Sequence, residues 1–277
     1  MKLIPNFDIS PFLQMVWVSE EARKTWEQPI RDCSALVSEL ELLSVVEGHR
    51  RCGWQSINIK SLPSFEQKCA NLGLTTLVVR FSAHFTGFAH KFQAINHIDD
   101  KTNVPVIFAG NPRVALEYKE AYDSGDHDKQ GKFLGFPKCC REFFSDVWAK
   151  GYFDPIFQMD RSRGFHPYSN PALRYIGIRI GFHIPCSFHC DETIKLAEQR
   201  MQLAYEKFPQ QAKLLAALLA MPMSWDALHG IAVVRTPLFY AITSSVPCEK
   251  KHVVEINGDF IPRESATGLI FPFKEIQ

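Results

Sequence analysis

The spacing of apolar residues predicts helices near the start of the chain. Between residues 12 and 50, apolar side chains recur every three or four positions, as they do on one face of a helix. Because proline removes a backbone donor and crowds the preceding turn, we expect Pro29 to break this helix and Gly48 to end it. A second helix is expected over residues 64–72, closed by Gly73.

Two runs rich in β-branched residues follow and predict strands, over residues 75–81 and 104–110. The second run is almost wholly apolar, which is typical of a strand buried on both faces. Asn111 and Pro112 then predict the start of a helix, because asparagine caps free amide groups and proline fits the first helical position. This helix is expected to end before Ser124, and the polar stretch "DSGDHDKQGK" predicts a loop.

The second half alternates in the same way between helix and strand patterns. A helix is expected over residues 139–150, and a longer one from Cys186 or Asp191 to about residue 208. Ser224 suits the cap of a short helix in "SWDALH". The segments "IAVVR" and "LFYAITS" predict strands near the C-terminus, and Asn257–Gly258 predicts the turn of a further hairpin.

These elements predict a helix-rich α/β or α+β fold with a small C-terminal β subdomain. We expect a helical N-terminal region over residues 1–74 and an α/β core over residues 75–230 that carries the functional site. Residues 231–277 would form the β subdomain, packed on that core. The chain has 277 residues, of which 46% are hydrophobic, and this is enough for a large buried core.

Charge and hydropathy exclude several classes of partner. The formal net charge is +1, so charge does not indicate nucleic-acid binding. No run approaches the roughly 18 apolar residues that cross a membrane, and the first residues do not resemble a targeting segment. We therefore expect a cytoplasmic protein without membrane contact. Disulfides are rare in that compartment, so clustered cysteines indicate metal binding or redox chemistry.

Four of the eight cysteines lie in two segments of similar construction, "GFPKCC" and "HIPCSFHC". In both, a proline shortly precedes cysteine at the expected start of a helix, where free backbone N–H groups and the helix dipole stabilise a thiolate. If Pro185 opens the second helix, Cys186 and Cys190 are four positions apart and lie on one face. Thiols from two helix starts can then meet around one ion or cluster, with Cys139 and Cys140 as the other two ligands.

Thiolate ligands select zinc, copper(I) or iron–sulfur clusters. We expect an iron–sulfur cluster first, because two positively polarised helix ends would offset its negative charge and nearby phenylalanines would exclude water. A closed zinc site with four thiolates, or with three and His183 or His189, is the alternative. The spacing departs from the common zinc C-x2-C pairs. Burial of the cysteines as small apolar residues and metal-free dithiol chemistry are the other two interpretations.

The segment "SWDALHGIAVVR" holds the next candidates for chemistry. Asp226 and His229 are three positions apart, so on a short helix the carboxylate can orient the imidazole for acid–base work. Arg235 can hold an anionic substrate group with two hydrogen bonds. The alternative is structural: Asp226 caps a turn, His229 benefits from a helix C-terminus and Arg235 pairs with a surface carboxylate.

Three blocks of the sequence, "LGFPKCCREFF", "IGFHIPCSFHCDETIKLA" and "MSWDALHGIAVVRTPLF", resemble the signature blocks of domain of unknown function 483, an uncharacterised family. The resemblance covers roughly residues 104–240 and leaves out the N-terminal hundred. It implies that Cys139, Cys140, Cys186 and Cys190 act as a set, and that His183 and His229 belong to the same site. It implies no particular reaction.

Together these observations predict an iron–sulfur protein that acts on a small anionic substrate or transfers electrons. If three cysteines bind the cluster, its open iron can act as a Lewis acid, as in an oxidoreductase or lyase, with His229, Asp226 and Arg235 around it. The partner would be a small-molecule substrate or a redox protein. The alternative function is a structural zinc protein that binds a protein or RNA, and a metal-free dithiol oxidoreductase is a third possibility.

Overall fold

The computed structural model describes residues 13–79, 81–82, 93–94, 100, 102–148, 159–160, 162–221, 223–226 and 231–244. Contacts divide the chain into two compact units, residues 38–151 and residues 1–37 with 152–277. The long helix α1, Glu20–Val46, begins in one unit and ends in the other. The division that the sequence suggested, at residues 74 and 230, stays a prediction.

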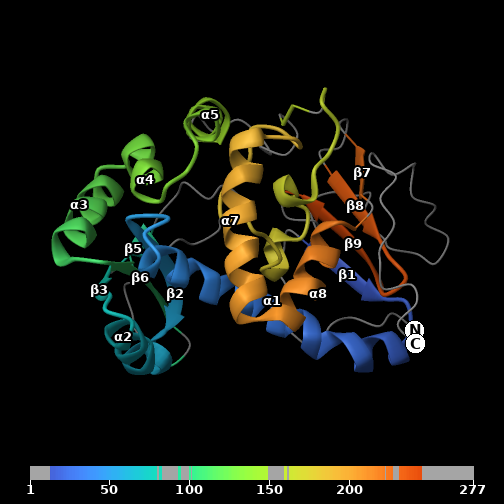
Figure 1. Cartoon of the computed structure of the whole chain (residues 1–277), viewed down its shortest axis with the longest axis horizontal. Helices are drawn as coiled ribbons and strands as arrows, with labels where there is room; N and C mark the ends of the chain where they lie inside the picture. Colours follow the sequence, from blue (N-terminus) through green and yellow to red (C-terminus); the bar gives the residue numbers. More distant parts are fainter. Residues whose placement is uncertain are drawn as a thin grey trace. The chain divides into compact units, whose positions relative to one another are not determined.

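A three-stranded antiparallel sheet forms the centre of the unit over residues 38–151 (Figure 1). Its strand order is β2 (Cys52–Asn58), β6 (Asn103–Ala109) and β3 (Thr75–Val78). Strand β6 is central and pairs with both neighbours, Trp54 and Leu77 lying opposite its Ile107. The two strands predicted for this region are confirmed. A short pair, β4 (Phe81–Ser82) and β5 (Gln93–Ala94), forms a separate ladder.

Helices cover both faces of this sheet, which explains why β6 is apolar at almost every position. Ile107 belongs to a buried cluster with residues of α3 (Pro112–Asp123) and α4 (His127–Phe133). The next residue, Phe108, points to the other face and packs with residues of α1 and α2 (Leu62–Asn71). Gly53 lies opposite Phe108, where a Cβ would be 2.4 Å from the ring, so a glycine leaves room for the aromatic side chain.

Local signals set the ends of several helices as the sequence predicts. The Asn111 side chain accepts a hydrogen bond from the Val114 amide at 3.0 Å and caps α3, with Pro112 as its first residue. Gly48 and Gly73 follow α1 and α2 with φ of 72° and 73°, in the left-handed region that glycine enters without strain.

Two expectations for residues 20–133 are wrong. Pro29 lies inside α1 and does not break it. From the residue after the proline onward, the helix buries an apolar face, at Ile30, Leu36 and Leu40 among others, and this burial stabilises the helix through the proline. The polar stretch after α3 forms the helix α4, not a loop. Its start is capped by the Asp126 side chain, which accepts from the Lys129 amide at 2.9 Å.

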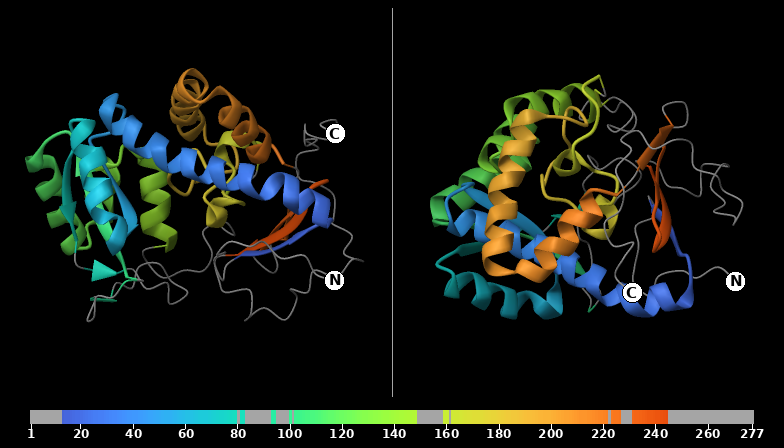
Figure 2. Two further views of the ribbon diagram at one scale, coloured as in Figure 1. Left: turned by 90° about the horizontal axis from the view of Figure 1, so that it is seen from below. Right: turned by 45° about the vertical axis from the view of Figure 1, so that its right-hand side comes forward.

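The other unit contains a four-stranded antiparallel sheet of order β1-β9-β8-β7. Its strands are β1 (Leu13–Trp17), β7 (Met223–Asp226), β8 (Ile231–Arg235) and β9 (Phe239–Ser244). Figure 2 shows the blue β1 beside the orange-red C-terminal strands. The strands expected in "IAVVR" and "LFYAITS" are confirmed, and the fold is the helix-rich mixture of helices and strands that was expected. The predicted hairpin at Asn257–Gly258 lies outside the described residues.

The two edge strands of this sheet, β1 and β7, correct two further expectations. Residues 13–17 are a strand and not part of the first helix, since they pair along β9, with Met15 opposite Ala241. Ser224 does not cap a helix, because residues 223–226 pair with β8 and Trp225 lies opposite Ala232. In both cases a partner far along the chain determines the structure of a short segment.

Helices α7 (Asp191–Lys207) and α8 (Pro209–Leu219) lie side by side in the same unit (Figure 1). They are preceded by two short 3₁₀ helices, η3 (Pro167–Ser169) and η4 (Arg174–Ile176). A third, η1 (Ile59–Ser61), precedes α2. Within the described part of the chain, no helix combines the length and the apolar character needed to cross a membrane.

Replacing Phe108 with alanine should lower the free energy of unfolding by about 3–5 kcal/mol, because it opens a cavity between the sheet and its helices. Denaturant unfolding followed by circular dichroism measures the change. The control is Leu116→Ala on α3, where the side chain is 53% exposed and the change should stay within about 0.5 kcal/mol. Equal unfolding midpoints for both variants would contradict the packing described for β6.

Candidate metal centre

The first cysteine pair lies in the first turn of α5, Lys138–Phe143, with Pro137 as the N-cap residue. Cys140 is buried and Cys139 is more accessible, yet their sulfur atoms are only 3.9 Å apart. The helix predicted over residues 139–150 is confirmed at its start. It continues as a π-helix over Phe144–Trp148, and residues 149–151 lie outside the described part.

Arg141 anchors the start of α5 against the rest of its unit. Its Nε donates to Asp128 Oδ1 at 2.9 Å, and its Nη1 donates to the carbonyl oxygen of Phe136 at 2.6 Å. The Arg141 and Lys132 hydrogen bonds hold the pKa of the Asp128 carboxyl below its usual value. Gly131 makes this contact possible, since a Cβ there would lie 2.5 Å from Arg141 Cδ. The backbone that carries Cys139 and Cys140 is thereby fixed on α4.

The second pair precedes α7 and is arranged differently from the expectation. Cys190 is the N-cap residue of α7, and the Ile194 amide donates to its carbonyl oxygen at 2.9 Å. Cys186 lies in the turn before the helix, so the two cysteines do not stack on one helical face. The acidic residues Asp191 and Glu192 occupy the first turn, where the helix dipole favours negative charge.

Backbone contacts with Asp160 explain why the helix does not begin at Pro185. The Asp160 amide donates to the carbonyl oxygen of Cys186 at 3.1 Å, and the Phe188 amide donates to that of Asp160 at 2.9 Å. These bonds form an isolated parallel bridge between Asp160 and Ser187. The segment that presents Cys186 is therefore held extended by a neighbouring stretch of chain and cannot wind into the helix.

The sulfur atoms of Cys139, Cys140, Cys186 and Cys190 all lie within 4.8 Å of one another. Four thiol ligands at this spacing can hold a metal ion, which is the grouping that the sequence predicts. Two of the four are buried, Cys140 and Cys190, so the group has limited contact with water.

His183 was expected as a further ligand, and protein oxygen atoms lie at hydrogen-bond distance from both of its ring nitrogens. Nδ1 is 2.6 Å from the carbonyl oxygen of Gly181, and Nε2 is 2.9 Å from Thr193 Oγ1. These contacts place the imidazole beside the cysteine-bearing turn. Its role as a ligand stays a prediction.

The structure describes two of the three predicted catalytic residues, Asp226 and Arg235. Asp226 is the last residue of β7, and His229 lies outside the described residues. Arg235 is exposed at the end of β8, with its guanidinium 5.1 Å from the centre of the Tyr240 ring. Asp226 was expected on a short helix together with His229, and this expectation is wrong, because Asp226 lies in a strand. The acid–base assignment itself stays a prediction.

His189 was expected as an alternative ligand, and that role stays a prediction. Two side chains near the cysteine segment, His166 and Arg200, were not predicted as part of the site. The rings of His166 and His189 lie 5.5 Å apart, and burial, with His189 nearby, lowers the pKa of His166. Arg200 on α7 is 1% exposed, although an arginine on a helix is ordinarily at the surface. For Arg200 the sequence holds one signal, its position seven residues after Thr193, which places both on one helical face.

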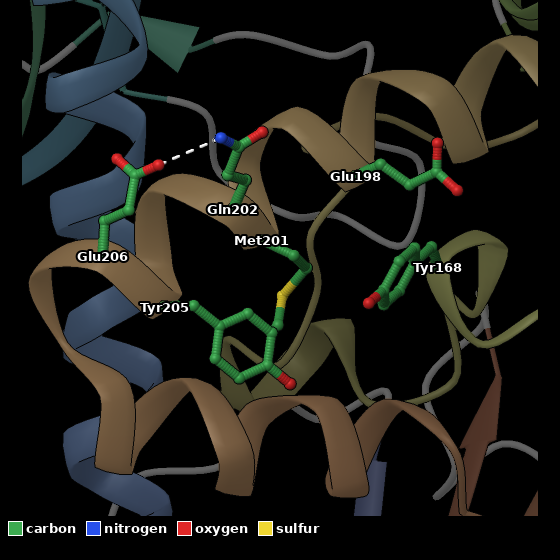
Figure 3. Close-up of a pocket in the computed structure, with 6 residues that line it drawn as sticks. All are labelled: Tyr168, Glu198, Met201, Gln202, Tyr205 and Glu206. Carbon is green, nitrogen blue, oxygen red and sulfur yellow. Dashed lines mark hydrogen bonds between the residues drawn. The ribbon is translucent and has the colours of Figure 1, made fainter.

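A shallow pocket of about 490 Å³ lies beside α7, and none of the four cysteines lines it. Figure 3 shows Tyr168 and Tyr205 facing the pocket together with the α7 side chains. Burial raises the pKa of the Tyr168 hydroxyl, and the nearby Tyr205 and Glu198 act in the same direction. The lining residues are Tyr168, Glu198, Met201, Gln202, Tyr205 and Glu206.

The cysteines outside the group are buried thiols in the described part of the chain. Burial raises the pKa of Cys33 and Cys52 to about 12 and that of Cys69 to about 11. These three side chains belong to the core. Cys248 lies outside the described residues.

Comparisons with family models, with curated proteins and with solved structures found no match. The resemblance to domain of unknown function 483 therefore rests on the three sequence blocks alone.

Alkylation of the native protein, stripped of metal by a chelator, should separate the two classes of cysteine. At pH 8, thiols with pKa values of about 11 to 12 are ionised to about one part in a thousand or less, so Cys33, Cys52 and Cys69 should label slowly. Cys139 and Cys186 are the more accessible members of the group and should label first. Peptide mass spectrometry after brief iodoacetamide treatment measures the order.

The same experiment has a pH dependence with a definite sign. Because the thiolate is the nucleophile, labelling of Cys69 should accelerate about tenfold per pH unit up to its raised pKa of about 11. Urea-unfolded protein, in which every thiol is accessible, is the control. Rapid labelling of Cys33 and Cys52 at pH 8 in the folded protein would contradict their burial.

Proposed function

We propose that this chain binds one zinc ion through Cys139, Cys140, Cys186 and Cys190, and that the ion has a structural role. The observation that supports this proposal is the gathering of four sulfur atoms within 4.8 Å of one another. Thiolates are the ligands that zinc shares with copper(I) and iron–sulfur clusters, so the ligand set alone leaves the metal open. The spacing of the sulfur atoms provides the argument for zinc.

A tetrahedral ion with metal–sulfur bonds of about 2.3 Å spaces its sulfur ligands about 3.8 Å apart. The 3.9 Å between the sulfur atoms of Cys139 and Cys140 is close to this value, and the remaining pairs lie within 4.8 Å. In a four-iron cluster each cysteine binds a different iron, so the ligand sulfur atoms spread further apart than around one ion. The spacing thus favours a single ion over the cluster expected first.

Adjacent cysteines on a regular helix point about 100° apart, which argues against their binding one ion. Here the pair lies in the first turn of α5, directly after Pro137, and the two sulfur atoms approach to 3.9 Å. The local geometry therefore permits both to contact the same ion.

Four thiolate ligands fill the coordination sphere of zinc and leave no position for substrate. We therefore propose binding to a partner protein or RNA as the function, in preference to chemistry at the metal. The resemblance of the three cysteine- and histidine-containing blocks supports a further proposal, that the chain belongs with the family of domain of unknown function 483. An enzymatic role would require Asp226, His229 and Arg235 to act without an open metal site.

Wild-type protein purified without added metal should contain one zinc ion per chain by elemental analysis. Cys140→Ser and Cys190→Ser should each lose most of it, because a hydroxyl is a poor replacement for a buried thiolate ligand. Cys69→Ser is the matched control, since Cys69 is equally buried in the core and lies outside the group. Its zinc content should stay at one per chain.

Cobalt(II) added to the stripped protein reports the ligand number, since a tetrahedral thiolate complex absorbs strongly in the visible. Retention of the metal by Cys186→Ser and Cys190→Ser, with loss only in Cys139→Ser and Cys140→Ser, would contradict a four-ligand site. A brown protein with stoichiometric iron and sulfide after anaerobic purification would reject zinc in favour of the cluster. Free titratable thiols without any metal would favour a dithiol oxidoreductase.

A further inference from the structure

One face of α7 is buried along its whole length and carries an arginine in its middle. Thr193, Ala197, Arg200 and Ala204 recur at intervals of three or four residues and are at most 1% exposed. Nη1 of Arg200 donates to the carbonyl oxygen of Ile180 at 3.0 Å and to that of Gly181 at 2.7 Å. The guanidinium thus binds the backbone of the segment that leads into the cysteine turn.

Phe182, which follows Gly181, has φ of 59°, in the left-handed region that residues other than glycine rarely adopt. Such a conformation persists only where the surroundings hold it in place. The Arg200 guanidinium lies 4.3 Å from the centre of the Phe182 ring, a cation–π contact, and also binds the two preceding carbonyl groups. One side chain therefore holds both the backbone and the ring at this turn.

His183 connects the same turn to the start of α7. The carbonyl oxygen of Gly181 can only accept, so Nδ1 of His183 carries the proton of this 2.6 Å bond. In the neutral ring, Nε2 then accepts from the hydroxyl of Thr193 at 2.9 Å. Thr193 lies three residues after Cys190, and His183 lies three residues before Cys186. The bond therefore ties together the two short segments that carry the second cysteine pair.

We propose that Arg200 is a positioning residue for the metal site: it fixes the turn of residues 180–183 on α7 so that Cys186 is held beside Cys190. This inference rests on the proposed metal binding. A turn that is fixed before the metal arrives loses less conformational entropy on binding, and the metal is bound more tightly. His183 and Thr193 provide the second connection in the same arrangement.

The test is Arg200→Met in the full-length chain, which keeps an unbranched apolar side chain and removes every donor. Competition with a chromophoric chelator should show a zinc dissociation constant about 10- to 100-fold higher than that of wild type. The visible bands of the cobalt(II) complex should shift, because the sulfur atoms of Cys186 and Cys190 are no longer held in one geometry. Arg200→Lys should fall between the two, since an ammonium group can donate to the carbonyl oxygens but lacks the plane that lies over the Phe182 ring.

The matched control is Arg174→Met in the same unit. Nη1 of Arg174 also donates to a backbone carbonyl, that of Pro171 at 3.0 Å, and its guanidinium lies 4.1 Å from the centre of the Tyr175 ring. The segment that it binds carries no cysteine, so its zinc affinity and cobalt spectrum should match those of wild type. An equal loss of affinity in both variants would overturn the specific role of Arg200.

The outcomes separate this inference from the proposed function. Wild type without any zinc or cobalt binding would reject the metal site itself. Wild-type affinity and an unchanged cobalt spectrum in Arg200→Met would overturn the positioning role, even if the metal-free variant unfolds at a lower temperature. If Arg200→Met does not fold by circular dichroism, Thr193→Val tests the second connection at nearly constant volume. Unchanged affinity in that variant would overturn the proposal, and a loss of several-fold would support it.

Discussion

The crowding of four sulfur atoms within 4.8 Å is the constraint on which the proposed function depends. As thiolates they repel one another, and burial of two of them strengthens the repulsion because little water is present to screen it. A bound cation converts this repulsion into attraction. The metal, when present, should therefore stabilise the local structure around all four residues, and the sequence segments that carry them should be most ordered in the metal-bound protein.

Both cysteine pairs are held by arginine side chains that bind backbone carbonyl groups. Arg141 binds the carbonyl of Phe136 just before the first pair, and Arg200 binds those of Ile180 and Gly181 before the second. A guanidinium offers several donors in a fixed plane, so it can hold a turn that lacks regular hydrogen bonding. Each pair is thus fixed within its own unit by the same kind of interaction.

The sheet over residues 38–151 provides the scaffold for the first pair. Its central strand is covered on both faces, and α4, which packs on one of them, carries the Asp128 that binds Arg141. The core contacts of Ile107 therefore support the position of α5, because they hold α4 on the sheet and Asp128 of α4 binds Arg141 of α5. In the other unit α7 has the corresponding role, since its buried face binds the turn directly.

The sequence by itself determined the features that depend on neighbouring residues. Asn111 and Pro112 start a helix, and Gly48 and Gly73 follow helix ends, because caps and left-handed turns need only the local backbone. The grouping of the four cysteines could also be predicted, since each pair lies beside a proline at or near a helix start.

The tertiary structure decided the features that depend on distant partners. Pro29 stays helical because the part of its helix that follows has a buried apolar face, and Ser224 to Asp226 form a strand because β8 pairs with them. Cys186 lies outside α7 because the Asp160 backbone binds its carbonyl oxygen. Arg200 is buried because it donates to the carbonyl oxygen of Ile180, twenty residues earlier. The pattern of residues along the chain does not indicate which distant segments will meet, so these contacts could be found only in the folded protein.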